Sequence, residues 1–309
     1  MEYLQDKFKI VGRDTKESEK IYKPSLTFWQ DAWRRFKQNK IAMFFLFLII
    51  FFMIVAIVGT HISGYKYMEQ HLDKSFLTPG QGIKDRFYLG TDNFGRDQLT
   101  RISQGIRVSL MLSLIVVSIC IVFGTIYGSI SAYFGGKVDF IMTRIIEIVM
   151  AIPSLIYIIL LMVVMGNSLW TIIIAMSLTR WLNYALLVRG EVLKLKQSEY
   201  VMASQSLGAN FWWIIKKHLI PNALGVIIVS LTTDIPQIIF TEAFLSFIGL
   251  GVPIPQASLG NLVKEGFSYA DSYPYLFFIP ATVISLITLS FNIVGDALND
   301  ALNPKLRNS

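Results

Sequence analysis

The stretch that decides the fold is Glu191–Asn222, EVLKLKQSEYVMASQSLGANFWWIIKKHLIPN, a polar interruption between two long apolar runs. Helix-favouring residues fill its first half, and Gly208 followed by Asn210 supplies a helix stop. A second short helical run combines aromatic and aliphatic residues with two lysines, and Pro221 is expected to close it. The stretch therefore predicts a helix–glycine–helix hairpin between two membrane spans. Such a hairpin suits docking to a partner, and a solvated connector is the alternative.

Composition indicates a membrane protein. Of the 309 residues, 53% are hydrophobic and 16% charged, and the mean hydropathy is +0.53, which is not the mixture of a soluble globular domain. The net charge of +7 could suggest nucleic acid. Basic residues beside membrane spans, however, orient the chain and meet anionic lipid, and no basic–aromatic readout motif accompanies them. We therefore expect membrane lipid as a partner and no nucleic acid.

Six apolar runs are long enough to cross ~30 Å of hydrocarbon. Small residues at spacings of four in the second run would let helices approach closely, and a proline interrupts the third. The predicted fold class is an all-α polytopic membrane protein with six transmembrane helices. The expected spans are Ile41–Thr60, Val108–Tyr133, Ile145–Met165, Leu169–Val188, Ala223–Phe247 and Tyr275–Leu298.

Basic residues predict the topology. An even number of spans places both ends on one side, and Met1–Lys40 contains ten Lys and Arg residues, whereas the turn Gly166–Ser168 has none. The loop His61–Arg107 has seven, but loops of that length count for less in the positive-inside rule. Both termini and the hairpin are therefore expected in the cytoplasm. The predicted division is an N-terminal segment 1–40, a first span with a large extracytoplasmic loop 41–107, a five-helix core 108–300 containing loop 191–222, and a tail 301–309.

The N-terminal segment predicts an amphipathic helix. Within Leu26–Lys40, aromatic residues and one alanine fall along one side of a helix, with charged and polar residues around the rest. Such a helix suits the headgroup level of a membrane. A helix packed against a partner protein is the alternative.

Polar residues inside the fifth expected span are candidates for a transport path. An ionised group at the centre of a membrane costs about 2.5–3.5 kcal/mol of free energy on insertion scales. The polar residues of this span should therefore face the bundle interior or an aqueous cavity. They would line a path for a polar, flexible substrate such as a peptide, or else join helices around a proline kink. Arg180, in the fourth expected span, would snorkel to the interface or pair with an acid. The candidate path residues are Thr233, Asp234, Gln237 and Glu242.

The segment GTDNFGRD, Gly90–Asp97, has the chemistry of a turn. It lacks the spacing and the terminal Glu of a calcium-binding helix–loop–helix site, so no metal site is predicted there. We expect its charged residues to pair with one another and to fix an elbow before the second span. These residues are Asp92, Arg96 and Asp97, together with Arg107.

The sequence predicts no enzyme. The single cysteine, Cys120, lies in an apolar run, and the three histidines have no ligand spacing. The sequence lacks a GxxxxGK[ST] phosphate loop, and it shows no Ser–His or Cys–His arrangement typical of a nucleophile with its base. Transport would therefore need an ion gradient or a separate ATPase, and the rigid hairpin favours the ATPase.

The stretch Glu199–Pro221 resembles the "EAA" loop of ABC-importer permeases. That pattern has an acidic residue, small residues, a glycine and a proline, positions that Glu199, Ala203, Gly208 and Pro221 fill, with a methionine where an alanine is usual. Further motifs, in the family's order, are similar to the C-type membrane subunit of oligopeptide/dipeptide ABC importers from about Phe28 to the C-terminus. They are LGTDNFGRD (Leu89–Asp97), GIRVSL (Gly105–Leu110), AIPSL (Ala151–Leu155), TEAFLSFIGLGVP (Thr241–Pro253) and NIVGDALNDALNPKL (Asn292–Leu306).

The resemblance implies a multi-pass permease of the bacterial plasma membrane whose hairpin sits in a groove of a cytoplasmic ATPase. It implies as partners a second homologous permease, two cytoplasmic ATPases that bind ATP and Mg, and an extracytoplasmic peptide-binding (lipo)protein. This chain itself would bind no cofactor. The implied ATPase-coupling residues are Glu199, Ala203, Ser204, Leu207, Gly208 and Ala209.

Two alternatives to the importer stay open. One is a stand-alone gradient-driven carrier or channel that uses Asp234 and Glu242 as its ion site. The other is a membrane scaffold or receptor that recruits a cytoplasmic partner through the hairpin. The substrate also stays open, because relatives of such subunits serve oligopeptides, dipeptides, nickel complexes, sugars or signalling peptides.

Overall fold

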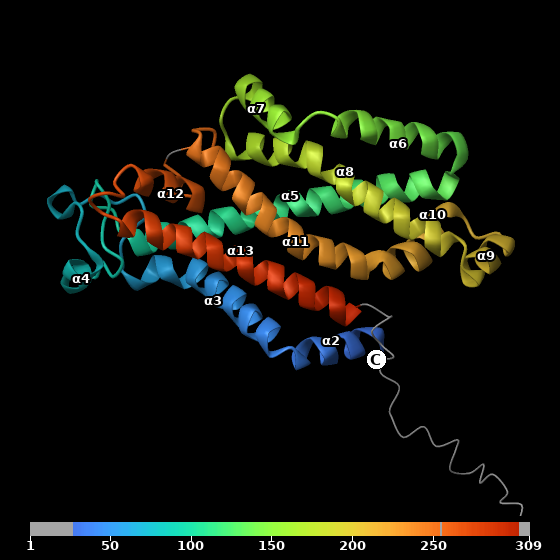
Figure 1. Cartoon of the computed structure of the whole chain (residues 1–309), viewed down its shortest axis with the longest axis horizontal. Coiled ribbons are helices and arrows are strands. Elements are labelled where there is room, and N and C mark those ends of the chain that lie inside the picture. The colour runs from blue at the N-terminus through green and yellow to red at the C-terminus, as the bar shows by residue number, and fades with distance from the viewer. Residues whose placement is uncertain (1–26, 254, 303–309) are drawn as a thin grey trace, which may run out of the picture.

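The computed structural model describes residues 27–253 and 255–302, which form a bundle of long helices (Figure 1). Within these ranges there is no β-strand, and Thr91 and Asp97 form an isolated bridge. Five helices are long and apolar enough to cross a membrane, and one bent pair of helices brings the number to as many as six. The predicted all-α polytopic fold class is confirmed.

The helices follow one another along the whole described chain. Short 3₁₀ turns lie at Leu72–Lys74 and Ile83–Asp85, and a π-helical segment lies at Ile215–Leu219. The α-helices are α2 (Phe28–Gln38), α3 (Lys40–Ile62), α4 (Pro79–Gly82), α5 (Gln98–Phe134), α6 (Gly136–Met150), α7 (Ser154–Met165), α8 (Leu169–Lys196), α9 (Glu199–Ser206), α10 (Phe211–Ile214), α11 (Ile220–Phe247), α12 (Leu259–Phe267) and α13 (Tyr275–Leu302).

Helix α5 begins ten residues before the expected start at Val108, so that expected boundary is wrong. The side chain of Asp97 caps the helix by accepting a hydrogen bond from the backbone N–H of Thr100 at 3.1 Å. The first turns carry polar residues that hydropathy assigns to a loop, but Thr100 and Arg101 are buried in the structure. Residues 98–107 therefore belong to a membrane helix rather than to the outer loop.

Helices α5 and α8 pack closely because α5 presents glycines to α8. A Cβ added at Gly124 would lie 2.8 Å from the backbone oxygen of Trp181, and one added at Gly128 would lie 2.9 Å from the backbone nitrogen of Arg189. Side chains at these positions would force the helices apart. The expected role of small residues at spacings of four is confirmed for these two glycines.

The third expected span is broken. Helices α6 and α7 meet at an angle of 76° around Pro153, as the position of the proline predicts. Helix α6 begins nine residues before the expected start of the third span at Ile145, because the chain reverses at Gly135 and Gly136 alone. Both glycines have positive φ values, +64° and +53°, which side-chain-bearing residues rarely adopt.

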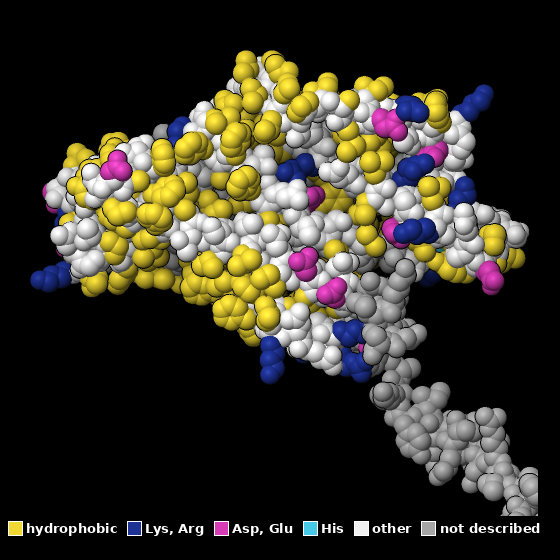
Figure 2. Space-filling view, in the orientation of Figure 1, with side chains coloured by type: hydrophobic (Ala, Val, Ile, Leu, Met, Phe, Trp, Pro, Cys, Tyr) yellow, Lys and Arg dark blue, Asp and Glu magenta, His cyan; other side chains and the backbone are white. Residues whose placement is uncertain are grey.

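Much of the lateral surface is apolar. Figure 2 shows hydrophobic side chains over much of the face in view. Large aliphatic and aromatic residues of α3 and α7 are exposed, among them Phe44, Phe47, Val163 and Val164. A continuous apolar surface of this extent suits hydrocarbon rather than water. Helix α2 buries Ala32 and Phe36 and leaves its other aromatic residues exposed.

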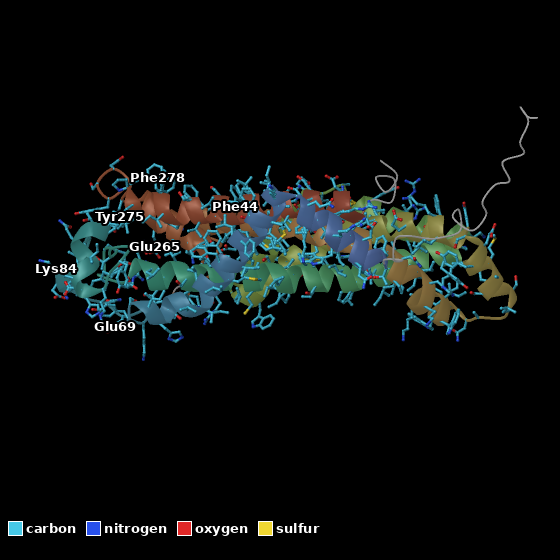
Figure 3. All side chains as sticks on the ribbon, turned by 90° about the horizontal axis from the view of Figure 1, so that it is seen from below. Phe44, Glu69, Lys84, Glu265, Tyr275 and Phe278 are labelled. Atoms are coloured by element: carbon cyan, nitrogen blue, oxygen red, sulfur yellow. The ribbon has the colours of Figure 1, made fainter. Side chains whose placement is uncertain are left out.

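The loop between α3 and α5, residues 63–97, forms a folded elbow at one end of the bundle. Tyr275 donates a hydrogen bond to the backbone oxygen of Thr91 at 2.7 Å and lies within reach of that of Leu77 at 2.9 Å. Lys74 pairs with Asp85 at 2.9 Å, and this carboxylate raises the pKa of the lysine. Figure 3 shows Lys84, Glu69, Glu265 and Tyr275 at this end, opposite the end that carries α9 and α10.

An ion-pair cluster joins the elbow to α12. Asp92 pairs with Arg96 at 2.6 Å and with Arg101, and Glu265 of α12 lies 3.1 Å from Arg96 and 2.9 Å from Arg101. The expected pairing of Asp92 with Arg96 is confirmed. The expected pairing of Arg107 is wrong for the described residues, where its side chain is exposed and forms no ion pair.

Candidate functional site

The hairpin between α8 and α11 begins with the short helix α9. Glu199 lies in its first turn, where a negative charge is favourable near the helix N-terminus. The helix ends at a glycine with φ +81°, Gly208, as the sequence predicts. The N–H of Gly208 bonds to the oxygen of Gln205 at 2.9 Å, and that of Ala209 bonds to the oxygen of Ser204 at 3.0 Å. This is a Schellman C-cap, which fixes the direction in which the chain leaves the helix.

The second limb of the hairpin runs without a break into the membrane helix. Asn210 caps α10 by accepting a hydrogen bond from the N–H of Trp213 at 2.8 Å, and the helical path then continues from Phe211 to Phe247. The expectation that Pro221 closes a separate short helix is therefore wrong. The π-helical segment before it widens the turn, which relieves the clash of a proline ring with the preceding turn.

One side of the hairpin is buried against the bundle. Val201, Ile214 and Leu219 are fully buried and pack in a cluster with the ends of α5 and α8. Two further contacts fix this cluster: Lys196 donates to the backbone oxygen of Tyr133 at 2.5 Å, and the rings of Tyr133 and Phe211 lie 4.7 Å apart. The hairpin is therefore attached to the bundle through Val201 and through its second limb, and the solvated-connector interpretation is not supported.

The other side of the hairpin is exposed. Leu207 at the turn has 88% of its surface exposed, although it is a large aliphatic residue. Of the six predicted coupling residues, four are exposed (Glu199, Ala203, Leu207 and Gly208), and Ser204 and Ala209 are partly buried. Exposed apolar side chains on a rigid support are typical of a protein–protein contact. The coupling roles of these residues stay predictions.

His218 connects the two limbs, a role that sequence reasoning missed. Its Nε2 lies 3.2 Å from the hydroxyl of Ser204 on α9, and its ring contacts those of Trp213 and Tyr200 with centroids 5.0 and 5.5 Å away. No local signal could have identified this contact, because the two limbs meet only after the chain turns at Gly208.

A polar cluster lies midway along α8 and α11. Figure 2 shows a basic and an acidic side chain side by side at mid-length on the face these helices share. Arg180 of α8 lies 3.6 Å from a carboxylate oxygen of Asp234 on α11, 3.5 Å from the amide oxygen of Gln237 and 3.1 Å from the hydroxyl of Thr241. The expected pairing of Arg180 with an acid is thus present. Arg180 is not among the predicted path residues, and a charged residue within a membrane span is the signal that could have included it.

Two cavities meet at this cluster. The larger, of about 620 Å³, lies where the break between α6 and α7 leaves space beside α8 and α11, and it is lined in part by Pro153, Asn183 and Phe240. The smaller, of about 440 Å³, lies between α11 and α13 and is lined in part by Thr288 and Asn292. Both volumes fall within the range of small-molecule sites.

The four predicted path residues do not form one lining. Gln237 lines both cavities, and Asp234 pairs with Arg180 without being part of either lining. Thr233 bonds to the backbone of its own helix, at 3.0 Å from the oxygen of Ser230. Glu242 is fully buried and accepts hydrogen bonds from Ser109 of α5 at 3.2 Å and Ser246 at 2.7 Å. Its contacts fit the inter-helix interpretation, and a path role for all four residues stays a prediction.

In the described ranges, no group of three or more His, Cys, Asp or Glu side chains is arranged to hold a metal ion. Cys120 is buried and free, with its sulfur 3.8 Å from the backbone oxygen of Ser177.

Two family models match the chain. The model described as binding-protein-dependent transport system inner membrane component matches residues 121–308, and the model of the N-terminal TM domain of oligopeptide transport permease C matches residues 27–79. The first match covers more than half of the chain. The chain belongs to the family of binding-protein-dependent transport system inner membrane components. It is a multi-pass membrane permease of an ABC importer and not an enzyme.

Full-length relatives agree with this assignment. The oligopeptide transport system permease protein OppC of Bacillus subtilis is 45% identical to this permease over 300 residues, covering 97% of each chain. The dipeptide transport system permease protein DppC of the same organism is 43% identical over 306 residues, covering 98% of this permease and 94% of the relative. The predicted resemblance to oligopeptide/dipeptide permeases is confirmed.

A solved structure shares the fold of the permease. A chain of the MetNI methionine ABC transporter, crystallised in inward-facing conformations, aligns with a TM-score of 0.53 at 18% identity, covering 65% of this permease and 96% of that chain. At this identity the likeness concerns the fold alone.

Proposed function

We propose that this permease imports oligopeptides as one half of a translocation path that it forms with a second, homologous permease. The similarity to oligopeptide and dipeptide permeases along almost the whole chain supports a peptide substrate. Two cytoplasmic ATPases bind ATP and Mg, and an extracytoplasmic peptide-binding lipoprotein delivers the peptide. The permease itself binds no cofactor.

The observation that carries this proposal is the uninterrupted helix from Phe211 to Phe247. One end of this helix forms a limb of the hairpin, and its middle carries Asp234, Gln237 and Thr241 at the polar cluster. A movement of the hairpin can therefore be transmitted to the cavities along one continuous helical path. ATP can bias the bundle only through contacts that differ between two states, and the docked hairpin provides them.

The proposed topology places both termini and the hairpin in the cytoplasm. In support, the hairpin, α2 and the end of α13 lie toward one end of the bundle, and the elbow with α12 lies at the other (Figure 1). Segment 1–40 is then cytoplasmic, the elbow extracytoplasmic, and loop 191–222 the coupling loop of the core 108–300. Residues 1–26 and 303–309 lie outside the described residues.

The test is ATP-dependent peptide uptake in vesicles that contain the permease with its co-purifying partners. We expect uptake that requires both ATP, on the side of the membrane that carries the ATPases, and an added peptide-binding protein on the opposite side. Flux that persists without ATP and collapses with the proton gradient would instead support a gradient-driven carrier using Asp234 and Glu242. Partner binding without any flux would support a scaffold.

A further inference from the structure

We propose that Arg180 is a specificity-determining residue that recognises the terminal carboxylate of the peptide as it passes through the membrane. This inference rests on the proposed function and adds to it a chemical group of the substrate. Arg180 is the twelfth residue of α8, about 16 Å from the start of that helix at 1.5 Å per residue. Arg180 is therefore placed well inside the span, where a charge is costly unless it is paired or faces an aqueous cavity.

Arg180 presents a positive charge to both cavities. Among the described residues that line the two cavities, it is the only one with a formal charge, and its side chain retains 17% of its exposure. Its counter-ion, Asp234, is not part of either lining. The side chain of Asp234 is itself 15% exposed, so the carboxylate neutralises the guanidinium without being part of either cavity lining.

The bond between Arg180 and Asp234 is loose compared with a structural pair of the same chain. Arg189 holds Asp139 with two hydrogen bonds of 2.5 and 2.6 Å, and this fork joins α8 to α6. Arg180 instead meets Asp234 through one nitrogen at 3.6 Å. A guanidinium has five N–H donors in a fork that matches a carboxylate, so Arg180 keeps donors for a second carboxylate.

The surroundings of Arg180 fit one end of a peptide. Gln237, Asn183 and Thr179 offer amide and hydroxyl groups for peptide bonds, and Phe240 and Phe244 offer apolar surface for side chains. Every unmodified peptide carries one terminal carboxylate whatever its sequence. Recognition of this group selects the class of substrate and leaves the sequence of the peptide free.

The test compares three forms of one tripeptide in vesicles that contain the complete transporter: the free acid, the C-terminal amide and the N-acetylated acid. The affinity of the binding protein for each form is measured separately, and uptake is measured with the binding protein saturated. The selectivity of the permease is then the ratio of maximal uptake rates. We expect the wild type to favour the free acid over the amide by about tenfold, the size of one hydrogen bond to a charged group.

Arg180→Gln should abolish this preference by slowing the free acid and not the amide. Because this variant leaves Asp234 without its counter-ion, the neutral pair Arg180→Gln/Asp234→Asn provides a second version whose fold does not depend on an unpaired buried charge. Arg180→Lys should keep part of the preference. Arg144→Gln is the matched control, since Arg144 is exposed on α6, where it pairs with Glu147 and lies over the ring of Phe140, and it lines neither cavity. This variant should behave as the wild type.

The inference is overturned if the wild type transports acid and amide at equal maximal rates, or if the neutral pair keeps the full preference. Acetylation of the amino end should leave the effect of Arg180→Gln unchanged, and an equal loss for acetylated and amidated forms would also contradict it. If the wild type shows no ATP-dependent uptake of any form, the proposed function fails, and the inference with it.

Discussion

The hydroxyl of Ser204 lies 3.2 Å from Nε2 of His218, and this contact joins α9 to the helical path that continues as α11. The two residues are fourteen positions apart and face each other across the turn at Gly208. Because the ring of His218 also packs against Tyr200 and Trp213, it holds both limbs of the hairpin as one body. The exposed surface of α9 and the polar cluster in the membrane are therefore mechanically connected.

Replacing His218 should uncouple the transporter without dissociating it. In His218→Ala, α9 loses the contact of Ser204 and Tyr200 with the ring of His218 and keeps only the packing of Val201 against the second limb, so less of its displacement by the ATPase is passed on to α11. We expect peptide uptake per ATP hydrolysed to fall by about fivefold, the low end of the range for coupling energies. His61→Ala, at the exposed end of α3, is the control. Normal coupling in His218→Ala would show that the contact is dispensable.

Leu207 should anchor the partner ATPase. Burial of a leucine stabilises a contact by about 1.5–3 kcal/mol, so Leu207→Asp should weaken co-purification of the ATPase at least about tenfold. Leu72→Asp is matched in chemistry and also exposed, but it lies in the elbow at the opposite end of the bundle. If the two substitutions weaken ATPase binding equally, or Leu72→Asp alone does so, the hairpin is not the docking surface.

A side chain at Gly208 should be unfavourable because of the backbone conformation of this residue. Its φ of +81° costs an L-residue about 1–2 kcal/mol, although no atom lies within 4 Å of an added Cβ. Gly208→Trp adds bulk to the exposed turn as well, and we expect loss of uptake with normal membrane insertion. Gly190→Ala, in open space within α8 and without a positive φ, should transport normally. Uptake at the wild-type rate in Gly208→Trp would contradict the coupling assignment.

Substitutions of Glu242 and Gln237 should have different effects, the first on the stability of the permease and the second on uptake. Glu242→Ala leaves Ser109 and Ser246 without their partner, and the lost hydrogen bonds should destabilise the permease by about 2 kcal/mol. Gln237→Ala lies on the same helix but in the cavity lining, so it should change uptake and not stability. Thermal unfolding of the purified complex, measured beside uptake, distinguishes the two. A stable Glu242→Ala with altered uptake would restore Glu242 to the path.

Local chemistry determined much of this fold from the sequence. Continuous apolar runs fixed the spans because a membrane helix satisfies all its backbone hydrogen bonds by itself. Pro153 fixed the break between α6 and α7, and Gly208 fixed the end of α9, because each imposes a backbone geometry that needs no distant partner. For the same reason, the hairpin could be recognised before its packing was known.

Contacts between distant residues decided the rest. The first turns of α5 read as a loop because Arg101 is polar, yet it is buried where Asp92 and Glu265 pair with it. Pro221 reads as a stop, yet the π-helical segment carries the helix through it. The sequence showed that Arg180, Asp234 and Glu242 lie inside the membrane. Only the packing of α5, α8 and α11 separated the charge that faces the cavities from the carboxyl group that is sealed between helices, because burial depends on which helices become neighbours.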